Sequence, residues 1–121
     1  NFWATFCEPC TREWPALDKL AARVADQKDI VIIAVSIDKD REAIARYLER
    51  MDLQESGVIV LWDPSGSLHL QFGSDLIPDT YFLSRSGEVR RVFVSVRDWG
   101  SPAALRCTTA SASERTAPSL V

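Results

Sequence analysis

The chain has 121 residues, of which 46% are hydrophobic, and this is enough for one domain with a single buried core. Its 14 basic and 17 acidic side chains give a net charge of -3, without a cluster of lysine or arginine, which argues against nucleic acid as a partner. No apolar run approaches the roughly 20 residues that a membrane-spanning helix needs.

The first twenty residues, NFWATFCEPCTREWPALDKL, contain the most informative local pattern. A short apolar run at residues 2–4 leads into Cys7. Behind Cys10, apolar residues recur at the spacing of one helix face, at Trp14, Leu17, Leu20, Ala21 and Val24. This stretch predicts a buried strand, a sharp turn and a helix whose first turn carries both cysteines.

Hydrophobic patterning separates the rest of the chain into alternating strands and helices. A continuous β-branched run is typical of a strand covered on both faces, and Asp38 or Asp40 can cap the helix that follows. The predicted elements are a strand at residues 30–35, a helix at 41–51, a buried strand at 58–62, a short helix at 67–72 and a hairpin of strands at 80–83 and 89–96. This order predicts an α/β fold in which helices flank both faces of a mixed sheet.

The end of the chain has a different composition. Residues 101–105 predict the start of a helix, with serine as the cap and proline at the first helical position. Residues 107–121 are mostly Thr, Ser and Ala without hydrophobic periodicity, so we expect a disordered tail after a domain of residues 1–106. Cys107, in this tail, is either an inert thiol or a source of intermolecular disulfides.

The spacing of Cys7 and Cys10 determines their chemistry. Residues i and i+3 of a helical turn have Cβ atoms about 5–6 Å apart, so the two sulfurs can alternate between dithiol and disulfide. The loop-entropy model assigns only about 2 kcal/mol to so short a loop, which favours a bond that is made and broken over a structural cross-link. Zinc is the alternative, but it commonly needs four ligands, and only His69 and Cys107 are available as further soft ligands, so no metal site is predicted.

Several motifs together resemble a known family. The run NFWATFCEPCTREWP resembles the active-site segment of TlpA- and ResA-type thioredoxin-like oxidoreductases, which act on thiols and disulfides outside the bacterial cytoplasm. VIIAVSID at residues 31–38, DPSG at 63–66, IPDTYFL at 77–83 and SGEV at 86–89 follow in the family's order. The resemblance covers about residues 1–100 and implies a thioredoxin-like fold that lacks at least one strand at its start. Phe6 is a departure, because the family usually has tryptophan there.

The residues around the cysteines suggest distinct roles. Cys7 lies at the predicted helix N-terminus, where unpaired N–H groups favour a thiolate, so we expect it to be the nucleophile. Cys10, one turn inside the helix, would be the resolving thiol. The Glu8 carboxylate disfavours a nearby thiolate by about 1–3 kcal/mol, which predicts a reductant of disulfides. Pro9 stiffens the turn between the cysteines.

Other roles are implied by the resemblance. Glu13 matches the family's active-site glutamate, which accepts or relays a proton, although a first-turn glutamate also interacts favourably with the helix dipole. Pro78 matches the family's cis-proline, and Ile77 would line the substrate groove beside it. Without the resemblance, an Ile–Pro bond is far more often trans.

The remaining aromatic side chains are given structural roles. We expect Trp3, Trp14 and Trp62 in the core, and Trp99 matches a common family residue after the last strand. His69 has no partner at a useful spacing and is expected at the surface.

The predicted function is disulfide exchange with protein substrates through Cys7 and Cys10, without a bound cofactor and in the reducing direction. The resemblance implies the bacterial cell envelope, in the periplasm or on the outer face of the membrane, with a tether outside this chain. It also implies a membrane electron donor and a role like that of cytochrome c biogenesis proteins; we expect a monomer. The alternative is a non-catalytic thioredoxin-fold module that binds a metal or another protein.

Overall fold

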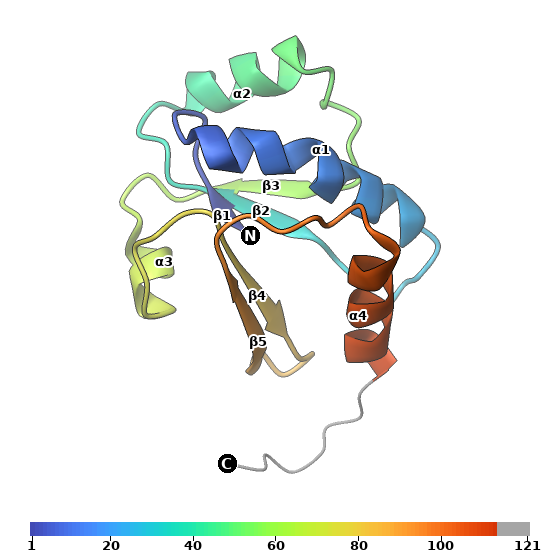
Figure 1. Cartoon of the computed structure of the whole chain (residues 1–121). Helices are drawn as coiled ribbons and strands as arrows, with labels where there is room; N and C mark the ends of the chain where they lie inside the picture. The colour runs from blue at the N-terminus through green and yellow to red at the C-terminus, as the bar shows by residue number, and fades with distance from the viewer. Residues whose placement is uncertain (114–121) are drawn as a thin grey trace.

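The computed structural model describes residues 1–113, which contain five strands and four helices (Figure 1). In chain order these are β1 (Phe2–Trp3), α1 (Glu8–Arg23), β2 (Ile33–Ser36), α2 (Arg41–Arg50), β3 (Ile59–Trp62), α3 (Ser67–Gln71), β4 (Asp79–Leu83), β5 (Val89–Val94) and α4 (Pro102–Ser113). None of these helices is long and apolar enough to cross a membrane.

The strands form one mixed sheet in the order β3-β2-β1-β4-β5. β1 and β3 run parallel to β2, whereas β4 is antiparallel to both β1 and β5. Phe2 lies between Val35 of β2 and Asp79 of β4, so β1 occupies the centre of the sheet. This central position brings the chain before Cys7 next to the chain after Pro78.

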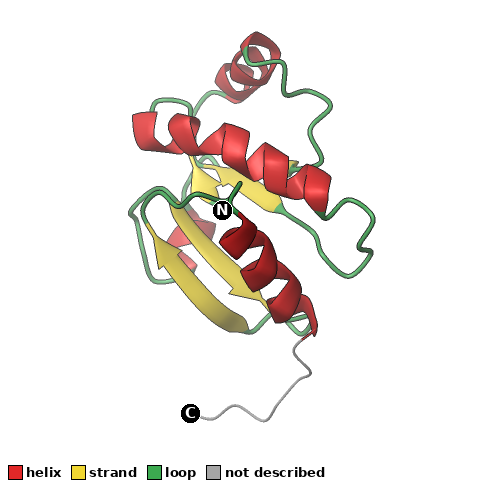
Figure 2. Ribbon diagram, turned by 45° about the vertical axis from the view of Figure 1, so that its right-hand side comes forward, coloured by secondary structure: helices red, strands yellow, loops and turns green. Residues whose placement is uncertain are grey.

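Helices lie on both faces of the sheet, as predicted, but they cover the two faces to different extents. Trp3 points toward α1 and α2, which lie side by side over one face (Figure 1). Phe2, the preceding residue, points the opposite way and stacks on His69 of α3. Figure 2 shows α4 beside the β4–β5 hairpin, where Arg91 Nε donates to Ser111 Oγ.

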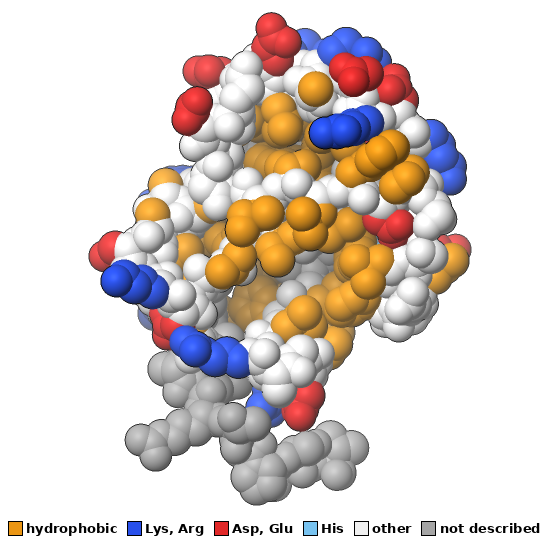
Figure 3. Space-filling view, turned by 180° about the vertical axis from the view of Figure 1, so that it is seen from behind, with side chains coloured by type: hydrophobic (Ala, Val, Ile, Leu, Met, Phe, Trp, Pro, Cys, Tyr) orange, Lys and Arg blue, Asp and Glu red, His pale blue; other side chains and the backbone are white. Residues whose placement is uncertain are grey.

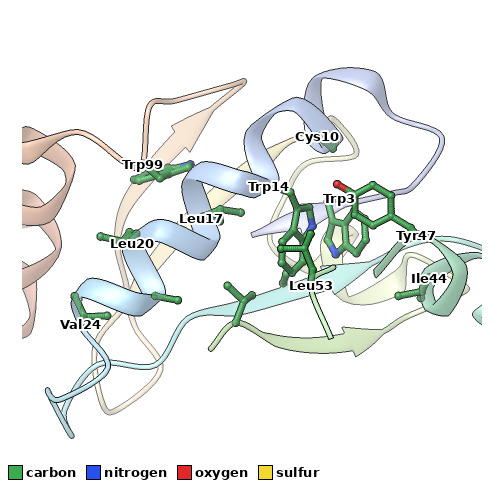
Figure 4. Close-up of a cluster of buried hydrophobic side chains, with 13 residues drawn as sticks. Trp3, Cys10, Trp14, Leu17, Leu20, Val24, Ile44, Tyr47, Leu53 and Trp99 are labelled. Atoms are coloured by element: carbon green, nitrogen blue, oxygen red, sulfur yellow. The ribbon is translucent and has the colours of Figure 1, made fainter. Parts of the chain in front are cut away.

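The core lies between the sheet and α1 (Figure 4). Trp3 and Trp14 are fully buried, with ring centroids 5.2 Å apart, and Tyr47 of α2 lies 5.4 Å from Trp3. Rings in edge-to-face or tilted contact add to the stabilisation that burial of their area provides. The predicted core roles of Trp3 and Trp14 are thus confirmed.

The opposite face of the sheet is largely uncovered. Figure 3 shows apolar side chains around a hollow on this face, which belongs to a cavity of about 380 Å³ that extends between β2 and β4. The exposed apolar side chains on the strands include Ile33, Ile59, Leu61, Leu83, Val92 and Val94. Trp62, at the end of β3, is 43% exposed, so its predicted core role is wrong. The predicted burial of the 58–62 strand is confirmed for Val58, which is 5% exposed, but is wrong for Ile59 and Leu61. Apolarity of a short run does not reveal whether another element covers it.

α1 contains a proline in its interior, at position 15. Proline has no N–H, so the Thr11 carbonyl cannot accept the usual intrahelical hydrogen bond. The Tyr47 hydroxyl of α2 lies 3.4 Å from this carbonyl and donates to it. A side chain from the neighbouring helix therefore satisfies the group that Pro15 leaves free.

The C-terminal helix is longer than the composition predicts. α4 continues to Ser113, so the predicted disorder from residue 107 onward is corrected for residues 107–113. Thr108 is buried and donates to the Ala104 carbonyl, while Leu105 packs against the core. These tertiary contacts stabilise a segment of weak intrinsic periodicity, and the rest of the predicted tail, residues 114–121, lies outside the described residues.

Candidate redox site

Cys7 and Cys10 form a disulfide at the N-terminus of α1. Cys7 is the N-cap residue, and its Sγ accepts a hydrogen bond from the Cys10 N–H at 3.3 Å. Cys7 is half-buried, whereas Cys10 is only 1% exposed. An incoming sulfur can therefore reach Cys7 much more easily than Cys10, which agrees with the predicted order of attack.

A buried carboxylate fixes the turn that leads into the disulfide. Asp38, at 3% exposure, accepts hydrogen bonds from the backbone N–H of Thr5 at 3.0 Å and from the Thr5 hydroxyl at 2.6 Å. The Cys7 N–H then bonds to the Ala4 carbonyl at 3.1 Å. Asp38 was expected only as one of two possible helix caps, and the cap is instead Asp40, which accepts from Glu42 N–H. Sequence reasoning missed this role because the contact joins residues 33 positions apart.

The Ile77–Pro78 segment lies against the nucleophile. The Ile77 carbonyl oxygen is 3.9 Å from Cys7 Sγ, and the Ile77–Pro78 peptide bond is cis. Pro78 is buried and Ile77 is partly exposed. The structure thus brings Cys7 and these two residues together, in the arrangement that the resemblance implies.

Glu13 lies on the buried side of α1, at 2% exposure. Its Oε1 accepts from the Asn1 side-chain amide at 2.9 Å, and its Oε2 accepts from the Arg97 N–H at 2.8 Å. The same Asn1 amide nitrogen donates to the Thr80 hydroxyl oxygen at 2.9 Å. Burial raises the pKa of Glu13, and the hydrogen bonds from Arg97 and Asn1 oppose that rise only in part. Glu13 is therefore easier to protonate than an exposed glutamate.

Glu8 and Arg12 form an ion pair on the exposed side of α1. Their side chains are 3.4 Å apart and are 73% and 63% exposed, respectively. Arg12, which the sequence analysis did not select, places a cation beside the carboxylate that follows Cys7. It offsets part of the negative potential that Glu8 was expected to exert on the thiolate. Pro9 occupies the first turn of α1, as predicted.

Two other predicted positions differ from expectation. His69, expected at the surface, is 2% exposed and contacts Asp79, which is fully buried. The contact joins a helix to a strand across ten positions, so helical or strand periodicity could not reveal it. Cys107 is half-buried on α4 as a free thiol. Within residues 1–113, no group of three or more His, Cys, Asp or Glu side chains is arranged to hold a metal ion.

The fold and the site define a class of protein. A mixed five-stranded sheet with a Cys-x-x-Cys disulfide at a helix N-terminus, facing a cis-proline, is a thioredoxin-like domain. A family model described as Redoxin matches residues 1–106, and the chain belongs to this family.

Individual relatives agree with this assignment. The thiol-disulfide oxidoreductase ResA of Oceanobacillus iheyensis is 32% identical over 92 residues, which are 76% of this chain and 46% of the relative. The thiol:disulfide interchange protein DsbE of Pseudomonas fluorescens biotype C is 32% identical over 98 residues, 81% of this chain and 51% of the relative. The chain thus spans about half the length of these relatives.

Solved structures share the fold. StoA from Bacillus subtilis superposes with a TM-score of 0.74 at 17% identity, over 89% of this chain and 78% of its own. The exposed lipoprotein thioredoxin Etrx1 from Streptococcus pneumoniae strain TIGR4 has a TM-score of 0.74 at 22% identity, over 90% of this chain and 80% of its own.

Proposed function

We propose that this chain is the redox domain of a thiol-disulfide oxidoreductase that exchanges disulfides with protein substrates through Cys7 and Cys10. The observation that carries the proposal is the disulfide itself, with an accessible Cys7 at a helix N-terminus and a buried Cys10. Two relatives with 32% identity are named for the same chemistry, a thiol-disulfide oxidoreductase and a thiol:disulfide interchange protein.

The reaction balances as two successive thiol-disulfide exchanges. In the reducing direction, the Cys7 thiolate attacks a substrate disulfide, and one substrate sulfur leaves as a thiolate that takes up a proton. The Cys10 thiolate then attacks Cys7 Sγ, releases the second substrate thiol and forms the Cys7–Cys10 disulfide. Two electrons pass to the substrate, and no bound cofactor takes part.

In this mechanism, Glu13 accepts the proton that Cys10 must lose. It lies one helical turn beyond Cys10 on the same helix, and both side chains are buried. A glutamate with a raised pKa holds and releases protons nearer to neutral pH than an exposed one does, which suits a proton relay. Glu13 therefore acts on the second exchange rather than on the first.

The reducing direction, the partners and the location are parts of the same proposal. Glu8 disfavours the Cys7 thiolate and hence the dithiol form, although Arg12 reduces this effect. A dithiol that is not stabilised gives up its electrons readily, and a membrane reductase would resupply them. We place the protein in the bacterial cell envelope, which the motif resemblance supports, and one structural neighbour is an exposed lipoprotein thioredoxin. A role in cytochrome c biogenesis remains the specific expectation from the resemblance.

The decisive experiment is a redox titration of the Cys107→Ser protein against glutathione, with the state of Cys7 and Cys10 followed by thiol alkylation. We expect a reversible two-electron transition at a potential below about -230 mV, on the reducing side of the glutaredoxin range. Cys7→Ser should abolish reaction with a disulfide substrate, and Cys10→Ser should accumulate the mixed disulfide at Cys7.

One result would overturn the proposal, and another would overturn only the reducing direction. A folded protein without a reversible transition, which instead retains zinc or copper in stoichiometric amounts, would establish a non-catalytic binding module. A potential near that of the strong oxidant DsbA, about -120 mV, would leave the oxidoreductase intact but reverse its direction.

A further inference from the structure

A buried His–Asp pair lies directly behind the Ile77–Pro78 segment, on the face of the sheet opposite α1. Asp79, the residue after Pro78, is fully buried, and its Oδ2 is 3.1 Å from His69 Nε2. The Tyr81 hydroxyl donates to the same oxygen at 3.2 Å. The proposed exchange reaction makes no use of these three side chains.

The His69 ring joins the two strands that carry the two halves of the redox site. It stacks on the ring of Phe2, with centroids 4.2 Å apart and an interplanar angle of 13°. Phe2 belongs to β1, which leads into Cys7, and pairs directly with Asp79 at the start of β4. One imidazole therefore contacts the strand before the nucleophile and the residue after Pro78.

The chemistry of a buried carboxylate explains why this contact restrains the backbone. A carboxylate away from water is stable only when donors satisfy it, and loss of one donor costs about 1–3 kcal/mol or more. His69 and Tyr81 are the donors to Oδ2, and no donor within the described part of the chain reaches Asp79 Oδ1. Without His69, Asp79 must turn toward water, and the adjoining Ile77–Pro78 backbone would shift with it.

The Ile77–Pro78 backbone must stay close to its position beside Cys7 if a polypeptide substrate is to align along it. Its carbonyl is 3.9 Å from Cys7 Sγ, so a polypeptide that reacts at Cys7 must lie along this segment. A displacement of about 1 Å at a reacting centre can reduce a rate about a hundredfold.

We propose that His69 and Asp79 are positioning residues that hold the Ile77–Pro78 backbone in register with Cys7 for an extended polypeptide disulfide. The inference depends on the proposed redox function, since it concerns how a polypeptide docks at that site. It predicts that the pair affects reaction with polypeptides and has little effect on reaction with small disulfides, which need no alignment along the backbone.

The test compares two probes on the fully reduced protein in a Cys107→Ser background. The small probe is 5,5′-dithiobis(2-nitrobenzoate). The polypeptide probe is a short unstructured peptide whose single cysteine carries 5-thio-2-nitrobenzoate as a mixed disulfide. Both release the same coloured thiolate, so the ratio of the two second-order rate constants isolates the contribution of peptide docking.

We expect His69→Leu to lower the peptide-to-small-probe ratio about tenfold, as loss of a hydrogen bond to a buried charge implies. His69→Gln keeps an N–H donor at a similar reach and should stay within about threefold of the wild type. Tyr81→Phe keeps the ring and removes the second donor to Asp79, so it should lower the ratio about two- to threefold. The matched control is Phe72→Leu, which removes ring contacts to Phe2 and Tyr81 on the same face without touching a hydrogen bond.

An unchanged ratio in His69→Leu, or an equal fall in Phe72→Leu, would overturn the inference and assign the pair to stability alone. If His69→Leu does not fold, Tyr81→Phe against Phe72→Leu decides in the same way. Failure of the redox proposal looks different, because the wild-type protein would then show no reversible Cys7–Cys10 transition in the glutathione titration, whatever its ratio of rate constants.

Discussion

Each face of the sheet carries buried aromatic side chains and a buried carboxyl group, but helices cover much more of one face than of the other. Over one face, α1 and α2 bury Trp3, Trp14 and the carboxyl of Glu13. On the other face, α3 covers only a small aromatic patch around His69 and Asp79, and much of the strand surface is exposed (Figure 3). The comparison indicates that the covered face supplies both the stability and the chemistry, whereas the open face contributes through one buried pair.

The largest expected effect comes from shortening one side chain on each face of the sheet. Trp3→Ala should lower the free energy of unfolding by about 3–5 kcal/mol, because it leaves a cavity against Trp14 and Tyr47. Leu61→Ala, at a side chain that is 47% exposed, should cost about 1 kcal/mol or less. Urea unfolding of both variants measures the two values, and equal losses would show that the open face is covered in solution.

Asp38 tests how strongly the covered side of the site depends on one carboxylate. Asp38→Ala leaves the Thr5 N–H and hydroxyl without their acceptor and should lower the unfolding free energy by about 1–3 kcal/mol. It should also slow reaction at Cys7, because the turn before Cys7 loses its anchor. Asp40→Ala, which removes an exposed helix cap and an exposed ion pair with Arg46, is the control and should cost about 1 kcal/mol with an unchanged rate at Cys7.

Glu13 allows a test of the covered face by pH. Its pKa is raised in the folded state, so the folded protein binds this proton more tightly than the unfolded chain does. The contribution of Glu13 to stability is therefore most favourable below its unfolded pKa and declines as the pH rises through the folded pKa. Glu13→Gln lacks this decline, so its melting temperature relative to wild type should increase from pH 4 toward pH 8. The rate of disulfide formation by Cys10 should lose the part of its pH dependence that the titration of Glu13 contributes, whereas the part due to the thiols remains. Identical pH profiles for the two proteins would contradict both statements.

The smallest expected effect concerns the exposed edge of the site. Glu8→Gln removes the carboxylate beside Cys7, which favours the thiolate and the dithiol form, so the reduction potential should become less negative by about 10–20 mV. Arg12→Ala should shift it in the opposite direction, because the ion pair at 3.4 Å is lost. Glu49→Gln, on the exposed side of α2, is the control. Equilibration with glutathione measures all three, and shifts of the same sign would refute the role of this ion pair.

Short-range spacing alone was sufficient for several features. The placement of Cys7 and Cys10 at a helix start depends on residues within one turn of each other, and the order of strands and helices follows from local periodicity. Motif resemblance added the fold, which the structure and the Redoxin match confirm. The resemblance also pointed to Glu13 and Pro78. In the structure, the Ile77–Pro78 segment lies beside Cys7, and Glu13 lies on the buried side of α1.

The sequence by itself therefore determined the place of the cysteine pair at a helix start and the alternation of strands and helices, because both are encoded by neighbours in the chain. Only the tertiary structure decided which side chains are buried and which residues form hydrogen bonds with them. Trp62 is 43% exposed although its apolar run predicts burial, and His69 is buried because it stacks on Phe2 of β1 and contacts Asp79 of β4. Glu13 contacts Arg97 across 84 positions, and no local pattern encodes such a contact. Burial and pKa depend on what the fold brings near a side chain, and that is a property of the assembled sheet and helices.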